Sequence, residues 1–141
     1  MKQGIKAIFL DLGGTFRVVD EDNRPFIAEA HGRIKELCGT DMDPDTFYDF
    51  LNKRYDGYRE WALKYMCEAP EEMLWTRWLV PEWDRDKIEK AAKELTYCFR
   101  RAKGERVVVE KGVETVRELR KRGYLAGVTR DRIGTTESEE W

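Results

Sequence analysis

Ala7-Ile8-Phe9-Leu10, followed directly by Asp11-Leu12-Gly13-Gly14-Thr15, is the most informative part of this chain. The apolar run predicts a buried strand over residues 5–10, and the two glycines predict a tight turn that presents Asp11 at its end. In α/β proteins, chemistry is concentrated at this position, the carboxyl end of a strand. Glycine lets a backbone approach an anion closely, while an aspartate can act as a nucleophile or hold a magnesium ion. A strand that simply ends in a β-turn has the same pattern, so the rest of the chain must decide between the two interpretations.

The composition excludes several classes of partner. The chain has 141 residues, enough for one domain with a modest core or for a small core that carries an inserted subdomain. Its 26 basic and 28 acidic residues are interleaved and leave a net charge of −2, so binding to nucleic acid or to an anionic membrane is not expected. No apolar run approaches the roughly 18 residues that span a bilayer, and the N-terminus has no signal-like region. We therefore expect a cytoplasmic protein with no nucleic-acid or membrane partner.

Two residue types limit the chemistry further. The three cysteines, Cys38, Cys67 and Cys98, are scattered through helical patterns and form no Cys-x-x-Cys pair. This predicts free, buried thiols in a reducing compartment rather than a zinc site or a disulfide framework. His31 is the only histidine and no nucleophile elbow is present, so a Ser-His-Asp triad is not expected.

The middle of the chain has helical periodicity, and we expect four helices over residues 27–38, 44–65, 71–79 and 84–104. Asp43 followed by Pro44 is a helix-start signal, and Gly39 and Gly104 are stop signals. Aromatic residues recur through this region at helical spacing, which favours a helix–helix core over a pocket lining. They are Tyr48, Tyr55, Tyr58, Trp61, Tyr65, Trp75, Trp78 and Trp83.

The two ends of the chain carry patterns of a different kind. A short extended segment, a β-branched run, an amphipathic helix and a second buried strand are expected over residues 16–19, 106–109, 112–122 and 124–129. The order strand, helical insert, helix and strand predicts an α/β core with parallel strands. This core comprises residues 1–19 and 105–141, and the helical insert comprises residues 20–104.

The two ends of the chain and the helical insert resemble parts of a known family. Residues 8–15 are similar to the opening Asp-x-Asp-Gly-Thr motif of the haloacid dehalogenase superfamily of phosphatases and related hydrolases. Residues 112–129 are similar to the helix and strand that deliver the family's second motif, a Ser or Thr. The helical insert resembles the family's helical type of cap. The resemblance covers essentially the whole chain and implies a Rossmann-like three-layer core, incomplete here, with an inserted all-helical cap.

The resemblance also implies a magnesium-dependent phosphatase that acts on a small phosphorylated metabolite. Asp11 would attack phosphorus, form an aspartyl-phosphate and hold the magnesium ion, to which Gly13 would offer its backbone carbonyl. Thr129, at the end of the second strand, would donate a hydrogen bond to a phosphoryl oxygen. Both strands end on the same side of the sheet, so Asp11 and Thr129 can converge on one tetrahedral group. The implied phosphate-binding positions are Gly14, Thr15, Thr129 and Arg130.

Three departures from the family's pattern lower the expected activity. Gly13 stands where these phosphatases carry a second Asp, a general acid and base whose loss typically costs about 100- to 10,000-fold in rate. Arg130 stands where an Asn commonly follows the second motif. The chain ends at Trp141, before the family's phosphate-clamping Lys and acidic metal motif. We therefore expect a shortened member with weak or no activity, whose first strand has an open edge that favours a homodimer.

Two other functions stay open at this point. The chain could be a non-catalytic remnant or a binding module built on the helical insert. Residues 10–19 also resemble the first phosphate loop of the sugar kinase, actin and heat-shock ATPase superfamily, in which a β-hairpin contacts ATP and glycine at position 13 is normal. Further strands should follow such a hairpin, whereas this chain becomes helical after Pro25, so we rank this function below the first.

Overall fold

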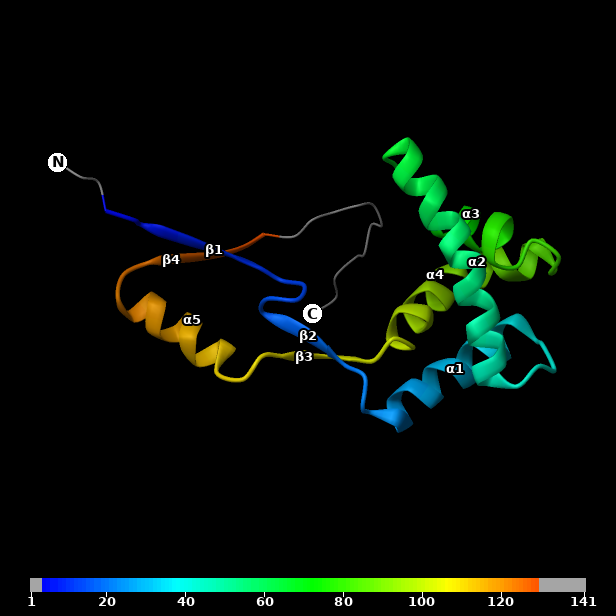
Figure 1. Cartoon of the computed structure of the whole chain (residues 1–141), viewed down its shortest axis with the longest axis horizontal. Helices are drawn as coiled ribbons and strands as arrows, with labels where there is room; N and C mark the ends of the chain where they lie inside the picture. Colours follow the sequence, from blue (N-terminus) through cyan, green and yellow to red (C-terminus); the bar gives the residue numbers. More distant parts are fainter. Residues whose placement is uncertain (1–3, 130–141) are drawn as a thin grey trace.

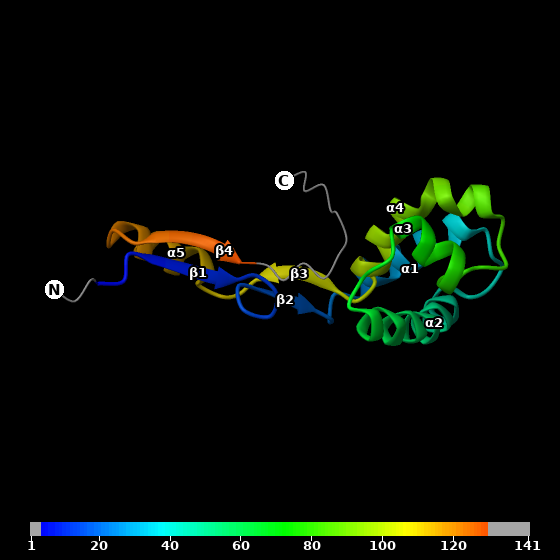
Figure 2. The same ribbon diagram turned by 90° about the horizontal axis from the view of Figure 1, so that it is seen from above.

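The computed structural model describes residues 4–129, a mixed α/β chain in two lobes (Figure 1). The helical lobe (residues 24–101) contains α1 to α4 and a π-helix, η1, and the α/β lobe contains β1, α5 and β4. Figure 2 shows the ribbon, β2 and β3, between the two lobes. The elements are β1 Ala7–Asp11, β2 Arg17–Asp20, α1 Arg24–Cys38, α2 Pro44–Tyr65, α3 Glu71–Met73, η1 Leu74–Leu79, α4 Arg85–Arg101, β3 Glu105–Val108, α5 Gly112–Lys121 and β4 Leu125–Thr129.

The strands pair in two separate sheets. β1 and β4 are parallel neighbours, as the sequence predicts, whereas β2 and β3 pair antiparallel. The β-branched run at residues 106–109 therefore does not join the parallel sheet. The reason is topological, because β2 leads the chain into the helical lobe and β3 leads it out, so two such strands lying side by side run in opposite directions. The described residues thus show a mixed α/β fold but not the predicted three-layer core.

The ribbon meets the helical lobe at a junction that requires glycine. Gly104 directly precedes β3 with a φ of +133°, and a Cβ there would lie 2.5 Å from the carbonyl oxygen of Asp20. Across the same junction, the Asn23 side-chain amide donates a hydrogen bond to Glu105 Oε2 at 2.7 Å. The entering and leaving strands are therefore held together where the helices begin.

The helices begin at capping residues. Asp43 accepts hydrogen bonds from the backbone N–H groups of Asp45 and Thr46, both at 3.1 Å, at the start of α2. Asp84 accepts one from the Lys87 N–H at 2.8 Å at the start of α4. These bonds satisfy donors that the first turn of a helix leaves unpaired. Across residues 4–129, none of the helices combines the length and apolar character needed to cross a bilayer.

The hydrophobic core lies in the helical lobe and at its edge. The cluster of buried apolar side chains runs from Ala30 to Ala102 and includes no residue of the α/β lobe. Burial of one such large side chain contributes about 1.5–3 kcal/mol. Seven of the eight aromatic residues that the sequence places in a helix–helix core join or pack against this cluster, whereas Tyr65 is 58% exposed. The largest fully buried side chains are Trp75, Phe47, Ile34, Leu51, Leu79, Ile88, Leu95 and Val80.

The third predicted helix, over residues 71–79, changes its winding at Leu74. From there to Leu79 the chain forms η1, and the Val80 N–H donates to the Trp75 carbonyl, five residues earlier, at 2.9 Å. The wider turn buries Leu74, Trp75 and Leu79 together, between α2 and α4. Apolar periodicity cannot reveal this change, because so short a π-helical segment barely alters the pattern of an α-helix.

The α/β lobe leaves much of its apolar surface uncovered. Phe9 is 67% exposed and Leu125 is 71% exposed. The strand register places both on the same face of the sheet, where the Phe9 ring lies over Gly127. Parallel strands are normally covered on both faces. Among the described residues, this face of β1 and β4 therefore has an apolar surface without a covering layer.

We expect the uncovered strands to make the chain associate. Sedimentation at micromolar protein concentration should show a homodimer or soluble aggregates, because β1 has no second neighbour among residues 4–129 and open edges favour pairing. On heating, the helical circular dichroism of residues 26–103 should outlast the α/β lobe, because the buried core is on the helical side. A monomer with a single cooperative transition would contradict both expectations.

The cysteines only partly follow the prediction of buried thiols. All three are free, and Cys38 and Cys98 are buried, but Cys67 is exposed just after α2. Burial raises the pKa of the Cys38 thiol to about 12 and also raises the pKa of Cys98. The prediction was wrong for Cys67 because the helix ends at residue 65 and its last apolar positions are exposed.

Candidate functional site

Two of the predicted site residues come together at the carboxyl edge of the parallel sheet. Asp11 is the last residue of β1, Thr129 is the last residue of β4, and the register pairs them directly. Directly paired residues of neighbouring strands project from the same face of a sheet. Both side chains are exposed and therefore project from one face at this edge. The predicted phosphate-binding residue Arg130 lies outside the described residues.

The glycine turn is closed by its own hydrogen bonds. The Gly14 N–H donates to the Arg17 carbonyl and the Arg17 N–H donates to the Leu12 carbonyl, both at 2.8 Å. Gly14 has a φ of +74°, in the left-handed region that glycine adopts at little cost. Among residues 4–129, apart from Gly13 and its chain neighbours, no atom lies within 4 Å of where a Cβ of Gly13 would be.

Gly14 and Thr15 both form hydrogen bonds within the turn. Because the Gly14 N–H is used within the turn, this residue shapes the loop and offers no free amide to a phosphate. The Thr15 hydroxyl donates to Asp11 Oδ2 at 3.3 Å and so orients the carboxylate. The phosphate contact predicted for Thr15 stays a prediction.

The oxygens present at the turn fit a magnesium ion held jointly with a substrate. Magnesium is usually bound by one or two carboxylates together with water and substrate phosphates. Asp11 supplies a carboxylate, and none of the hydrogen bonds that close the turn uses the Gly13 carbonyl. Within residues 4–129, no three His, Cys, Asp or Glu side chains are grouped so that they could hold a metal ion together.

A small hollow opens beside the glycine turn. Its volume is about 260 Å³, and it lies between the turn and one side of the ribbon. The described residues that line it are two glycines, two valines and two arginines, with no carboxylate among them. The lining residues are Gly13, Gly14, Arg17, Val18, Val19 and Arg106.

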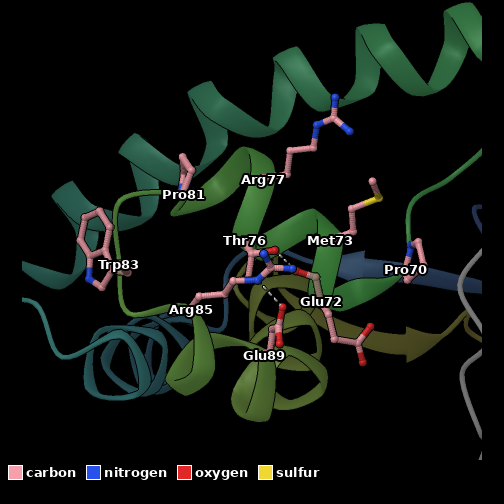
Figure 3. Close-up of a pocket in the computed structure, with 9 residues that line it drawn as sticks. All are labelled: Pro70, Glu72, Met73, Thr76, Arg77, Pro81, Trp83, Arg85 and Glu89. Atoms are coloured by element: carbon pink, nitrogen blue, oxygen red, sulfur yellow. Dashed lines mark hydrogen bonds and ion pairs between the residues drawn. The ribbon is translucent and has the colours of Figure 1, made fainter.

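A larger hollow of about 720 Å³ lies on the helical lobe, beside α3, η1 and the start of α4 (Figure 3). Trp83 lines one end of this hollow. Its charges are balanced, because the Arg85 guanidinium donates to Glu89 Oε1 at 2.7 Å inside the hollow. This surface therefore has no preference for a phosphate.

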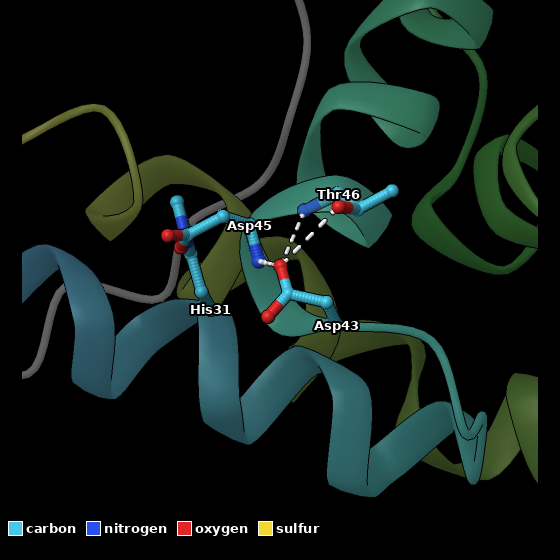
Figure 4. Close-up of polar contacts among 4 residues, drawn as sticks. All are labelled: His31, Asp43, Asp45 and Thr46. Atoms are coloured by element: carbon cyan, nitrogen blue, oxygen red, sulfur yellow. Dashed lines mark hydrogen bonds and ion pairs between the residues drawn. The ribbon is translucent and has the colours of Figure 1, made fainter.

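His31 contributes to helix packing rather than to a catalytic group. It is buried at the contact of α1 and α2, and its Nδ1 lies 2.6 Å from Asp45 Oδ1, beside the Asp43 cap (Figure 4). Its ring stacks on Tyr48 with the centroids 4.2 Å apart. Among the described residues, His31 Nε2 has no hydrogen-bond partner.

The strand pairing does not favour an ATP phosphate loop of the actin type. That loop requires a hairpin in which the first two strands pair, but here β1 pairs with β4 and β2 pairs with β3. Only an isolated bridge between Gly13 and Arg17 connects the two sides of the turn.

Comparison with protein-family models, with curated proteins and with solved structures gave no match. The geometry at the carboxyl edge of β1 and β4 is therefore what points to a function. The sequence patterns pointed to Asp11 and Thr129, but not to Arg17 and Arg106, which lie in two short strands far apart in the chain. The antiparallel register of β2 and β3 brings these arginines to one hollow, and no local pattern signals that pairing.

Proposed function

We propose that this chain is a hydrolase of the haloacid dehalogenase type, a magnesium-dependent phosphatase of small phosphorylated metabolites. In this proposal β1, α5 and β4 belong to a Rossmann-like core and the helical lobe is its cap. The observation that supports it best is the direct pairing of Asp11 with Thr129 at the ends of parallel strands. A tetrahedral phosphoryl group bound there would meet a nucleophile and a hydrogen-bond donor at once.

The proposed reaction has two steps. A carboxylate oxygen of Asp11 attacks phosphorus, the ester P–O bond breaks and an aspartyl-phosphate forms. The leaving alkoxide takes its proton from water, because Gly13 has no side chain that could supply one. Water then attacks the aspartyl-phosphate, which releases inorganic phosphate and restores the carboxylate.

Each neighbouring group has a defined part in these steps. The Thr15 hydroxyl occupies Asp11 Oδ2, so Oδ1 is the oxygen placed to attack. The Thr129 hydroxyl donates to a phosphoryl oxygen on which negative charge increases. A magnesium ion held by Asp11 and the Gly13 carbonyl would neutralise charge on the phosphoryl oxygens. Hydrolysis should be slow, because Gly13 offers no general acid to the leaving group.

The test is covalent labelling of the full-length chain. With magnesium and ³²P-labelled acetyl phosphate, we expect a protein-bound label that hydroxylamine removes, as it does for acyl phosphates. Asp11→Asn should abolish this label, because an amide is not a nucleophile at neutral pH. Thr129→Ala should slow labelling by about 100- to 1,000-fold, the usual effect of removing one donor to a developing oxyanion.

A matched control is Asp41→Asn, which removes an exposed carboxylate of the helical lobe. It should label like the unchanged chain. Equal labelling of the Asp11→Asn variant would overturn the assignment of the nucleophile. Robust magnesium-dependent turnover of an aryl phosphate that depends on Asp11 would show that a general acid is not needed here.

The alternative is a non-catalytic binding module, and the 720 Å³ hollow of the helical lobe is the observation that favours it. Its mixture of Met73, Trp83 and paired charges suits a ligand with an apolar part. The labelling experiment separates the two functions, because a module of this kind would not become covalently phosphorylated at Asp11.

A further inference from the structure

The hollow on the helical lobe has apolar walls at two ends and a polar middle. Trp83 and Pro81 lie at one end, and Met73 and Pro70 lie at the other (Figure 3). Its volume of about 720 Å³ is within the range of roughly 300–1,000 Å³ in which proteins bind small molecules. The other described residues that line it are Glu72, Thr76, Arg77, Arg85 and Glu89.

The wall formed by Trp83 is supported from behind by the core. The centroid of its ring lies 6.0 Å from that of Phe47 and 6.4 Å from that of Phe50. Phe47 is fully buried, whereas Trp83 is only half-buried, so part of the indole is left to line the hollow. The ring therefore offers a fixed surface on which an apolar or aromatic group can pack.

The opposite wall belongs to the turn that leads into η1. Met73 directly precedes η1 and is 37% exposed, whereas Leu74 and Trp75 beside it are buried. The unbranched side chain of methionine adapts to irregular apolar shapes. Two apolar surfaces from separate elements thus line the same hollow.

The charged side chains of the hollow are balanced, and three of the four are engaged. The Arg85 Nε–H donates to Glu89 Oε1 at 2.7 Å, and the Arg77 guanidinium lies 5.1 Å from the centre of the Trp78 ring. The fourth, Glu72, is exposed to water. An ion that entered the hollow would lose water without meeting a net opposite charge, which is unfavourable. The described lining therefore favours a ligand without a charge.

We propose that this hollow binds an uncharged ligand in which two apolar groups are joined by a polar link such as an amide. The apolar groups occupy the two ends, and the link lies beside Thr76 in the middle. The Thr76 hydroxyl donates to the Glu72 backbone carbonyl at 2.7 Å, so the lone pairs of its oxygen can accept from the link. The inference gives the helical lobe a ligand class of its own and does not depend on hydrolysis at Asp11.

The test is equilibrium dialysis of the full-length chain with small probes of matched shape. N-benzylbenzamide has two rings and a neutral link, dibenzylamine has a cationic link at neutral pH, and dibenzyl phosphate has an anionic link. We expect N-benzylbenzamide to bind about 10-fold more tightly than either charged probe, because a charge is costly to desolvate. It should also bind about 10-fold more tightly than benzamide, which has only one ring to bury.

Variants at the two ends locate the site. Trp83→Leu and Met73→Ser should each lower the affinity for N-benzylbenzamide to near that for benzamide. Met73 is partly exposed, so Met73→Ser tests the site if circular dichroism shows that Trp83→Leu does not fold. Tyr65→Ala, at an exposed aromatic position elsewhere on the helical lobe, is the matched control and should keep the affinity.

A second pair of variants tests the ion pair in the middle of the hollow. Glu89→Gln leaves Arg85 without its carboxylate, so dibenzyl phosphate should gain about 10-fold in affinity. Glu118→Gln does the same to Arg122 on α5, where the two side chains are also four positions apart and 2.8 Å from each other. This control should leave every affinity unchanged, and an equal gain in both variants overturns the site.

The remaining outcomes separate this inference from the proposed hydrolase. Equal affinity for neutral and charged probes, no binding of N-benzylbenzamide at millimolar concentration, or full affinity in both end variants overturns the site. Affinity that is lost in Asp11→Asn also overturns it, because the probe then binds at the edge of β1 and β4. Selective binding by a chain that is never labelled at Asp11 overturns the hydrolase and leaves this site standing.

Discussion

Gly13→Asp should raise the rate of phosphate-ester hydrolysis by about 100- to 10,000-fold, the usual contribution of a positioned general acid and base. Among the described residues the turn has room for the new side chain, because none beyond the chain neighbours of Gly13 has an atom within 4 Å of the position of its Cβ. The backbone of Gly13 is also outside the left-handed region, so an aspartate there meets no conformational penalty of that kind. A carboxylic acid two residues after Asp11 could protonate the leaving group and later activate water. The measurement is the magnesium-dependent release of 4-nitrophenol and of phosphate from an alkyl ester.

Gly13→Asn is the matched control, because it adds a side chain of similar shape that cannot exchange a proton in this way. The rate increase should be larger for the alkyl ester than for the aryl ester, since an alkoxide needs a proton more than a phenolate does. Equal rates for the Asp and Asn variants would contradict the assignment of Gly13 as the position that limits activity. Gly13→Asp in an Asp11→Asn background should restore nothing.

The sequence predicted best those features that local chemistry determines. Asp43 and Asp84 start helices because their side chains bond to nearby backbone N–H groups, and such signals are complete within a few residues. The parallel pairing of β1 and β4 was also predicted, because a strand, a helix and a second strand in order have few ways to pack. Asp11 and Thr129 follow from the same rule, since each is the last residue of its strand.

Features that depend on distant parts of the chain were missed. The separate ribbon of β2 and β3 follows from the place in the chain where the helical lobe is inserted. The β-branched composition of residues 106–109 would suit a parallel or an antiparallel sheet equally. The use of the Gly14 N–H inside the turn depends on its hydrogen bond to the Arg17 carbonyl, which the motif itself does not contain. These two differences change the site most, because one removes an expected phosphate donor and the other adds two arginines.

The division of stability between the lobes has a consequence for function. The phosphoryl site lies on strands with exposed Phe9 and Leu125, whereas the buried core belongs to the helical side. A substrate bound at the Asp11 edge would connect β1 and β4, which have few buried contacts of their own. Ligand binding should therefore stabilise the α/β lobe more than the helical lobe, since ligands stabilise the state that binds them.

Trp75→Ala should destabilise the helical lobe by about 3–5 kcal/mol, the usual cost of deleting a large aromatic side chain from a core. Trp75 is fully buried in η1, its ring lies edge-on to Phe99, and its Nε1–H donates to Thr96 Oγ1 at 2.9 Å. The substitution leaves a cavity beside the π-helix η1. It also leaves the buried Thr96 hydroxyl without this donor. Urea unfolding followed by far-ultraviolet circular dichroism measures the loss.

The hydrogen bond and the ring can be separated with two further variants. Trp75→Phe keeps an aromatic ring but removes the N–H, and its cost should fall below that of the alanine variant. Adding Thr96→Val to it should recover part of the loss, because replacing both partners by apolar groups removes the unpaired hydroxyl. Tyr65→Ala, at an exposed aromatic position, should change stability by less than about 0.5 kcal/mol. If the Trp75→Ala variant unfolds at the same urea concentration as the unchanged chain, the helical lobe does not depend on this buried indole. Such a result would contradict the expectation, drawn from the packing of η1 between α2 and α4, that a cavity at this position destabilises the lobe.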